Sequence, residues 1–334
     1  MRVSIKDIAK AAGVSHSTVS RALSDSPLVK AETQARIQRL AREMGYAPNA
    51  IARSLVTRQT RTVGVVVTTI ADPFVAEVVQ GVEDTAQENN YSIILASSAS
   101  EPERELAAVE MLRAKRVDAL IVTSSRVGAL YLEHLERIGV PVVLVNNHNK
   151  QSGRYTFSVG VDNQHGGYLA TSHLIERGHH RIGYISGPVE RSDSAERQAG
   201  YCQALDEADI PFDPSLVIPG NGRLDGGERA LSALVDLVER PTAVFCYNDM
   251  TAIGMISAAR KVGLSAPDDL AVVGFDDIPM AARFCPPLTT IAQPQHDMGR
   301  RAMDMALALM TANDPNMFLS NIIIEGKLIV RETT

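Results

Sequence analysis

The chain has 334 residues, of which 45% are hydrophobic and 22% are charged, and its formal net charge is −6. This composition is typical of a globular protein of two or three domains, and it excludes a disordered chain, a collagen-like chain and a disulfide scaffold. No apolar run approaches the roughly 18 residues of a membrane span, and the N-terminus lacks the apolar core of a secretory signal. The three cysteines are widely spaced and fit a reducing compartment, and no spacing typical of a zinc site occurs. We expect a cytoplasmic protein without a membrane partner, a metal or a cofactor.

Charge is divided unevenly along the chain. Residues 1–60 hold ten lysines and arginines and four acidic residues, a net charge of +6, whereas the remaining residues carry −12. A basic module joined to an acidic body indicates that the small part binds a polyanion and that the large part does not. A chance excess of basic residues on a solvated helical surface is the alternative.

The first 46 residues are expected to form three short helices. Residues 4–7 fit a capping box, and the apolar positions after them repeat with helical spacing up to Gly13, which can end a helix in the left-handed conformation. Ser15 can cap a second helix, and a third is expected over 32–44. Two short helices joined by a tight glycine turn are typical of a helix-turn-helix. Three such helices have little core, so we expect the unit to be marginally stable by itself.

These segments resemble the N-terminal module of the lactose-repressor-type (LacI) family of transcription regulators. The run IKDIAKAAGVSHSTVSRAL, followed by GYAPNAIARSL, carries the resemblance, and its A-x-x-A-G-V-S-x-x-T-V-S-R pattern is specific. The likeness continues in the segments VGVVV, SVGVDN, GHHRIGYISGP, ERQAGY, NDMTAIG, VVGFDDIPMA and PPLTTI. It implies that residues 1–46 form a helix-turn-helix DNA-binding domain.

By this resemblance the second helix is a recognition helix, whose N-terminal end meets base edges in the major groove. The expected base readers are His16, Ser17 and Arg21. The fork of an arginine matches the O6 and N7 acceptors of guanine, which suits Arg21 to base reading. Ser15 and Thr18 are expected to contact phosphates, and a simple helix cap is the alternative for Ser15. The family's usual serine cap on the third helix is replaced by Lys30, which can compensate by pairing with a phosphate.

Residues 47–60 are expected to be a linker with a short helix inside it. Pro48 suits the first turn of a helix, and the residues after it have helical composition, but so short a helix is unstable alone in water. The resemblance implies a hinge helix that pairs with its copy in the minor groove, with Leu55 wedged at a base step. Ala52 would permit the close approach, and Asn49 is a further expected DNA contact. A plain linker with Leu55 packed on the body is the alternative.

From residue 62 onward, expected strands alternate with expected helices. The β-branched run at 62–67 is typical of a buried parallel strand. The first series has strands at 62–67, 92–96, 119–123 and 142–146 and helices at 74–89, 103–115 and 127–138. The second has strands at 158–161, 182–186, 215–219, 243–247 and 270–275 and helices at 166–177, 194–208, 225–239 and 249–262. A last strand is expected over 322–330. Two such series predict two doubly wound halves facing each other across a cleft.

The resemblance implies the complete fold class: a small all-α helix-turn-helix domain plus an α/β, two-lobed, doubly wound body similar to periplasmic binding proteins. The implied body spans 61–334. Its N-terminal lobe takes about 61–161 and 293–320, and its C-terminal lobe about 162–290 and 321–334. The chain then crosses back between the lobes near 289–293, which periodicity alone does not indicate.

Polar residues lie at strand ends facing the expected cleft, where ligands of such sheets bind. The candidate ligand residues are Asp72, Phe74, Arg191, Asp193, Arg197, Asn248, Asp276 and Gln293. Carboxylates, amides and an arginine beside an aromatic ring suit a polyhydroxylated ring, because hydroxyls need both donors and acceptors. The resemblance places Arg197, Asn248, Asp276 and Gln293 at positions that bind sugars in sugar-binding relatives. A helix cap is the alternative for Asp276, and a surface charge for Arg191.

A sugar-controlled regulator has three alternatives: a regulator with a different effector, a transport component and an enzyme. A purine or sugar phosphate acting as corepressor suits Arg191 and Arg197, but the aromatic residue that stacks on a purine would fall near 221–222, where this chain has none. A sugar-binding transport component shares the body but not the basic module. An enzyme is disfavoured because no dinucleotide fingerprint, phosphate loop or nucleophile elbow occurs, and His179 and His180 lack the spacing of a metal pair.

The sequence therefore predicts a sequence-specific DNA-binding repressor under allosteric control by a small molecule, a sugar, bound in the cleft. One helix-turn-helix reads one half-site, so a homodimer on a pseudo-palindromic operator is expected. The chain ends soon after the last expected strand, with no segment for a tetramer-forming helix bundle, which also favours a dimer. The sequence identifies neither the direction of the effector's action nor a phosphoprotein partner.

Overall fold

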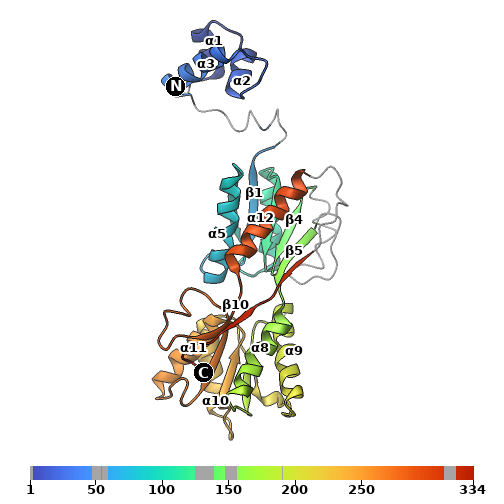
Figure 1. The fold of residues 1–334 in the computed structure, drawn as a ribbon, viewed down its shortest axis with the longest axis vertical. Helices are drawn as coiled ribbons and strands as arrows, with labels where there is room; N and C mark the ends of the chain where they lie inside the picture. Colours follow the sequence, from blue (N-terminus) through green and yellow to red (C-terminus); the bar gives the residue numbers. More distant parts are fainter. Residues whose placement is uncertain are drawn as a thin grey trace. The chain divides into compact units, whose positions relative to one another are not determined.

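The computed structural model describes residues 3–46, 54, 59–124, 139–146, 156–189, 191–311 and 321–334. The chain divides into two compact units, residues 1–60 and residues 61–334 (Figure 1). The expected hinge helix, including Asn49, Ala52 and Leu55, lies outside the described residues, and so does the helix expected over 127–138. Among the described residues, no helix is long and apolar enough to cross a membrane.

The first unit contains the three expected helices, α1 (Ile5–Ala12), α2 (His16–Leu23) and α3 (Ala31–Glu43). At the start of α1 the Asp7 carboxylate accepts from the Ser4 N–H at 2.9 Å and from the Ser4 hydroxyl at 2.7 Å. Gly13 ends α1 with φ 66°, a left-handed conformation that glycine adopts without steric cost. These local signals explain why the sequence predicts this unit closely.

A small apolar core holds the three helices together. The apolar stripe of each helix faces the others, which is the arrangement that helical spacing predicts. The buried members are Ile8, Ala9, Ala12, Val19, Ala22, Ile37 and Ala41. The side chain of Arg36 also donates to the carbonyl oxygen of Ala12 at 3.0 Å, which ties α3 to the end of α1.

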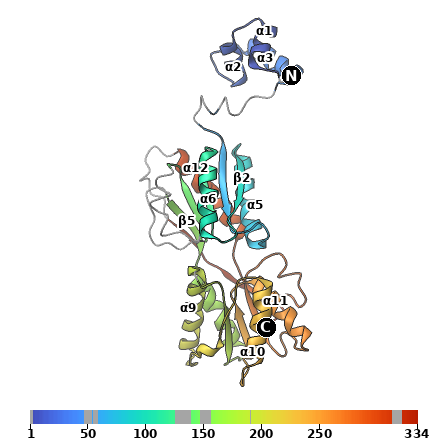
Figure 2. The same ribbon diagram turned by 180° about the vertical axis from the view of Figure 1, so that it is seen from behind.

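The second unit consists of two lobes, each built on a six-stranded sheet. The first sheet has the order β11-β5-β4-β3-β1-β2, and all its strands are parallel. Its strands are β1 (Thr62–Val67), β2 (Ser92–Ser97), β3 (Ala119–Thr123), β4 (Val142–Val145), β5 (Thr156–Val161) and β11 (Ile322–Ile324). The described helices on it are α5 (Pro73–Glu88), α6 (Pro102–Ala114) and α12 (Gln295–Thr311), with α6 on the face seen in Figure 2.

The second sheet has the order β12-β10-β9-β8-β6-β7, with only β12 antiparallel to its neighbour. Its strands are β6 (Ile182–Ser186), β7 (Val217–Pro219), β8 (Ala243–Cys246), β9 (Ala271–Asp276), β10 (Thr289–Ala292) and β12 (Lys327–Ile329). Its helices are α8 (Asn163–Glu176), α9 (Ser192–Glu207), α10 (Leu224–Val235) and α11 (Asp249–Lys261), with the short 3₁₀ turn η1 (Pro214–Leu216) before β7. This architecture confirms the expected fold class.

Three expectations about single elements are corrected. The strand expected over 322–330 is two strands: β11 pairs with β5 in the first sheet, and β12 pairs with β10 in the second. The residues between them, 325–326, therefore pass from one lobe to the other. The strand expected at 158–161, which sequence alternation groups with the second series, completes the first sheet as β5. The helix expected over 225–239 ends at Val235.

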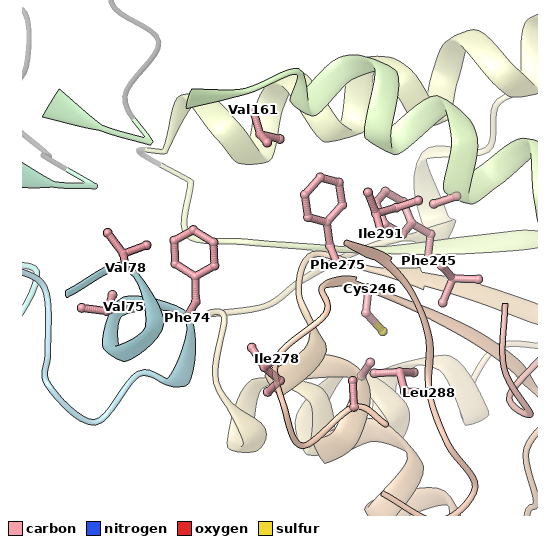
Figure 3. Close-up of a cluster of buried hydrophobic side chains, with 14 of the residues drawn as sticks. Phe74, Val75, Val78, Val161, Phe245, Cys246, Phe275, Ile278, Leu288 and Ile291 are labelled. Carbon is pink, nitrogen blue, oxygen red and sulfur yellow. The ribbon is translucent and has the colours of Figure 1, made fainter. Parts of the chain in front are cut away.

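Buried apolar residues of the two lobes join in one continuous cluster. Figure 3 shows part of it, where Phe74 at the start of α5 and Val161 at the end of β5 lie toward Phe275 and Ile291 of the second sheet. Parallel strands covered on both faces are buried throughout, which accounts for their continuous β-branched runs. The cluster places the carboxyl ends of both sheets near each other, and this is where the cavity described below lies.

Candidate functional site

The outer face of α2 presents polar side chains. Ser15 caps the helix by accepting from the Thr18 N–H at 3.1 Å, and its hydroxyl lies 2.8 Å from those of Ser17 and Thr18. His16, Ser17 and Arg21 are exposed. Ser15 is thus a helix cap in the unbound chain, and the hydroxyl of Ser17 is engaged within the same turn.

Lys30 stands at the N-terminus of α3 without a side-chain cap bond, and the residue is exposed. The loop before it is held to α3 by Asp25, whose Oδ1 accepts from Gln34 at 2.6 Å and from Gln38 at 2.8 Å. Asp25 has φ 54°, a conformation that favours short polar residues. These two bonds hold the loop that carries Lys30 against α3.

A cavity of about 490 Å³ lies between the two lobes at the carboxyl ends of their strands. This volume is in the range of small-molecule sites. The first lobe contributes hydroxyl, amide and carboxyl groups, from Thr68, Thr69, Asp72, Ser100, Ser124 and Asn146, together with Phe74. The second contributes most of the charge, from Arg191, Arg197, Arg223, Asp225 and Asp276, together with Asn221, Tyr247 and Asn248. Six of the eight predicted ligand residues line this cavity.

Arg197 is the centre of the second lobe's wall. Its side chain is only 1% exposed, and its guanidinium carbon lies 3.6 Å from the ring centroid of Phe275 and 4.7 Å from that of Tyr247. Its Nε donates to Asn163 Oδ1 at 2.9 Å, and its Nη1 donates to the Tyr247 carbonyl at 2.5 Å. Cation–π contacts and hydrogen bonds compensate the cost of burying this charge. The guanidinium group is therefore held rigidly at the cavity wall.

Asp276 lies beside Arg197, with 3.9 Å between Asp276 Oδ1 and Arg197 Nη1. Burial raises the pKa of the Asp276 carboxyl well above its usual value, and the charge of Arg197 offsets only part of this rise. Gln293, which is absent from the cavity wall, supports Asp276 from behind, because its Nε2 donates to Asp276 Oδ1 at 2.6 Å. Asp276 is a strand-end group with φ 120° and does not cap a helix, the alternative that the sequence left open.

Arg191 lines the cavity and pairs with Asp193, which lies behind the wall. The Arg191 Nε donates to Asp193 Oδ1 at 3.0 Å, and the hydroxyl of Tyr247 donates to Asp193 Oδ2 at 3.0 Å. Burial alone raises the pKa of Asp193, but the charge and hydrogen bonds of Arg191 outweigh it and lower the pKa to about 2. Arg191 is thus a partly buried ion-pair partner and not a solvated surface charge.

Asp72 and Asn248 are helix caps as well as wall residues. Asp72 Oδ1 accepts from the Phe74 N–H at 3.0 Å, and burial raises the pKa of its carboxyl. Asn248 Oδ1 accepts from the N–H and hydroxyl of Thr251 at 3.0 and 2.7 Å, while its Nδ2 donates to the Gly222 carbonyl at 3.0 Å. Phe74 lines the cavity and is 6% exposed.

Two prominent residues of the cavity wall, Asn146 and Tyr247, are not among the predicted ligand residues. Asn146 follows β4 directly, is 7% exposed, and has a buried Oδ1 atom without a hydrogen-bond partner. An orphaned buried acceptor in a cavity points to a donor on a ligand or a water. The hydroxyl of Tyr247 donates to Asp193, and the ring of Tyr247 lies against the guanidinium group of Arg197. Both residues directly follow a strand, so a prediction that includes every residue at a strand end would contain them.

Comparison with known proteins agrees with this architecture. A model of bacterial regulatory proteins of the lacI family matches residues 4–49, and a model of a periplasmic binding protein-like domain matches residues 171–334. The HTH-type transcriptional repressor PurR of Vibrio atlanticus is 38% identical over 312 residues, which cover 93% of this chain and 92% of PurR. The chain belongs to the LacI family. It is a transcriptional repressor, and the enzyme alternative is excluded.

Other relatives of this LacI-family repressor span it almost completely. The transcriptional repressor CytR of Escherichia coli K12 is 36% identical over 331 residues, which cover 99% of this chain and 96% of CytR. The lac repressor dimer bound to operator and the anti-inducer ONPF has a TM-score of 0.89 at 26% identity, covering 100% of this chain and 99% of that one. The CelR–cellobiose complex has a TM-score of 0.75 at 31% identity, covering both chains completely.

Proposed function

We propose that this LacI-family repressor binds a pseudo-palindromic operator as a homodimer in the cytoplasm and is controlled by a neutral sugar bound in the interlobe cavity. The observation that supports the proposal most is the cavity itself, where Arg197, Asn248 and Asp276 meet a wall of hydroxyl and amide groups from the other lobe. The lac repressor dimer on its operator is a full-length structural relative, and the CelR complex contains cellobiose.

Operator reading is assigned to the exposed face of α2. Among the residues that the structure describes, no side-chain hydrogen bond or ion pair engages Arg21, so its guanidinium group is available for a guanine. Lys30 is available for a phosphate. Phosphate contacts position the protein without specifying sequence, so the two residues have different expected effects.

Replacing Arg21 separates base reading from phosphate binding. We expect Arg21→Ala to lower discrimination between the operator and random duplex DNA by about 1–3 kcal/mol, because a bidentate contact to one base is lost. Lys30→Ala is the matched variant, and it should weaken binding to both duplexes by the same factor. Fluorescence anisotropy at one fixed salt concentration measures both. Equal weakening of both duplexes by Arg21→Ala would contradict the assignment.

The charge balance of the cavity favours a neutral effector. Arg191 is paired with the Asp193 carboxylate, and the charge of Arg197 is compensated by the rings of Phe275 and Tyr247 and by its hydrogen bonds. The guanidinium group of Arg223 is exposed. A phosphate group needs an available cation to offset its lost hydration, and no buried one on the described wall is uncompensated. This supports a polyol over a sugar phosphate.

A flat purine is supported less well. Asn221 and Gly222 line the cavity where a stacking ring would be required, and Phe74 and Tyr247 are almost completely buried. The test is calorimetric titration of the protein with D-ribose, cellobiose, D-ribose 5-phosphate, cytidine and hypoxanthine. Binding of a neutral sugar, abolished by Asp276→Ala, is the expected result. Tight binding of hypoxanthine or the phosphate with no sugar bound would replace the sugar assignment by the corepressor alternative.

A further inference from the structure

Within the part of the chain that the structure describes, three segments connect the two lobes. They lie between β5 and α8, between β10 and α12, and between β11 and β12. Any change in lobe orientation must be absorbed by backbone rotations in these crossovers. Two of the charged residues on the cavity wall are bonded to crossover residues, and this connection is independent of what the cavity binds.

The first connection joins Arg197 to the β5–α8 crossover through Asn163. Asn163 is 1% exposed and is the first residue of α8. Its Oδ1 accepts from Arg197 at 2.9 Å, and its Nδ2 donates to Glu196 at 3.1 Å and to the Val161 carbonyl of β5 at 3.4 Å. One amide therefore contacts α9 of the second lobe and the last residue of a strand in the first.

The second connection joins Asp276 to the β10–α12 crossover through Gln295. Gln295 begins α12, which packs on the first lobe, and its Nε2 donates to the Asp276 carbonyl of the second lobe at 2.5 Å. The φ of 120° at Asp276 is unfavourable for any residue with a side chain and persists only when its surroundings hold it. The Gln293 N–H donates to the same carbonyl at 3.1 Å. Gln293 and Gln295 together stabilise Asp276 in this conformation.

We propose that Asn163 and Gln295 are the positioning residues that couple the cavity wall to the interlobe crossovers. A group in the cavity that engages Arg197 or Asp276 changes the hydrogen bonds that Asn163 and Gln295 make, and so biases the lobe orientation. The first and third crossovers move together, because the Asp162 N–H donates to the Ile324 carbonyl at 3.0 Å. This inference rests on the proposed function only for the role of the movement, which is to control operator binding.

The test measures the lobe orientation directly and needs neither effector nor operator. Spin labels are placed at Glu103→Cys on α6 and Asp206→Cys on α9, both exposed, with Cys202 and Cys285 replaced by Ser and the fully buried Cys246 retained. Labelled chain is diluted with unlabelled chain so that pulsed electron resonance reads the distance within one chain. We expect Asn163→Leu and Gln295→Leu each to broaden or shift the interlobe distance distribution relative to the parent.

Two control variants separate coupling from ordinary destabilisation. Thr85→Val and Thr171→Val each remove one buried hydroxyl-to-carbonyl hydrogen bond inside a single lobe. They should lower the melting temperature and leave the interlobe distribution unchanged. If Asn163→Leu fails to fold, Gln295→Leu and the size-matched Gln295→Glu carry the test. A parent-like distribution in the folded variants, with stability losses like those of the controls, would overturn the proposal. Because no ligand is used, failure of the sugar assignment leaves this result interpretable.

Discussion

At the scale of single residues, the cavity wall contains an ion pair whose two charges neutralise each other before any ligand arrives. Arg191 and Asp193 form a largely buried ion pair in which Arg191 donates to both carboxylate oxygens, and the Tyr247 hydroxyl adds a hydrogen bond to Asp193 Oδ2. A buried pair contributes little net stability, but removing one partner leaves an uncompensated charge. The pair therefore fixes the shape of the wall more than it stabilises the fold.

Breaking the ion pair from one side tests this account. Arg191→Leu should lower the free energy of unfolding at pH 7 by about 3–5 kcal/mol, because Asp193 is left buried without its cation. The double variant Arg191→Leu/Asp193→Leu should recover most of that loss. Urea unfolding measures both. An additive loss in the double variant would show that the two side chains act independently.

The same pair predicts a pH dependence. The pKa of Asp193 is about 2 in the folded chain and 3.8 in the reference state, so its stabilising contribution is complete above about pH 4 and is lost as the pH falls toward 2. The stability difference between the parent and Arg191→Leu should therefore be largest above pH 4 and shrink below it. Urea unfolding from pH 7 down to pH 3 reads this trend, and a difference that grew on acidification would contradict the pKa.

At the scale of secondary-structure elements, helix pairs on both sheets approach backbone to backbone at glycines. A Cβ on Gly81 of α5 would lie 2.0 Å from a backbone oxygen of α12, and one on Gly299 of α12 would lie 2.0 Å from a backbone oxygen of α5. The pairs α8–α9 and α10–α11 show the same reciprocal pattern, through Gly167 with Gly200 and Gly227 with Gly254. These contacts set how closely the helices pack.

Gly81→Ala tests the close approach between α5 and α12. The added methyl group collides with the backbone, so we expect a loss of about 1–3 kcal/mol in unfolding free energy despite the better helix propensity of alanine. Gly183→Ala in β6 is the control, because its Cβ would meet only ordinary contacts at 3.5 Å and beyond. Thermal unfolding compares the two. Equal stability of Gly81→Ala and the parent would mean that the helices can separate without cost.

Sequence patterns predict these elements well where the signal lies within the element itself. The β-branched runs and the caps at Ser15 and Gly13 locate strands and helices to within a few residues. Pairing between distant segments leaves no such signal. Residues 322–330 have one apolar pattern, yet β11 and β12 join different sheets, because their partners β5 and β10 belong to different lobes. The strand-end position of Asn146 is readable from the sequence, but nothing in its own segment shows that its acceptor lacks a partner.

At the scale of the whole molecule, the chain joins a helix-turn-helix unit to a body whose two lobes share a cavity. Six of the candidate ligand residues meet at that cavity although they come from segments far apart in the sequence, which the rule that ligands bind at strand ends anticipates. The supporting roles of Asp193 and Gln293 depend on side-chain geometry that the sequence does not carry. We propose a dimer as the working form, and a monodisperse tetramer in sedimentation at micromolar concentration would contradict it.

The central claim is that occupancy of the cavity and affinity for the operator are linked. The direct measurement is operator affinity by fluorescence anisotropy at fixed salt, with an operator obtained by genomic site selection, in the presence and absence of each compound in the effector panel. We predict that one neutral sugar changes the operator Kd by about 5–150-fold, a typical coupling, and that Asp276→Asn binds the operator but loses this response. No response to any compound, or the same response in Asp276→Asn, would contradict the account.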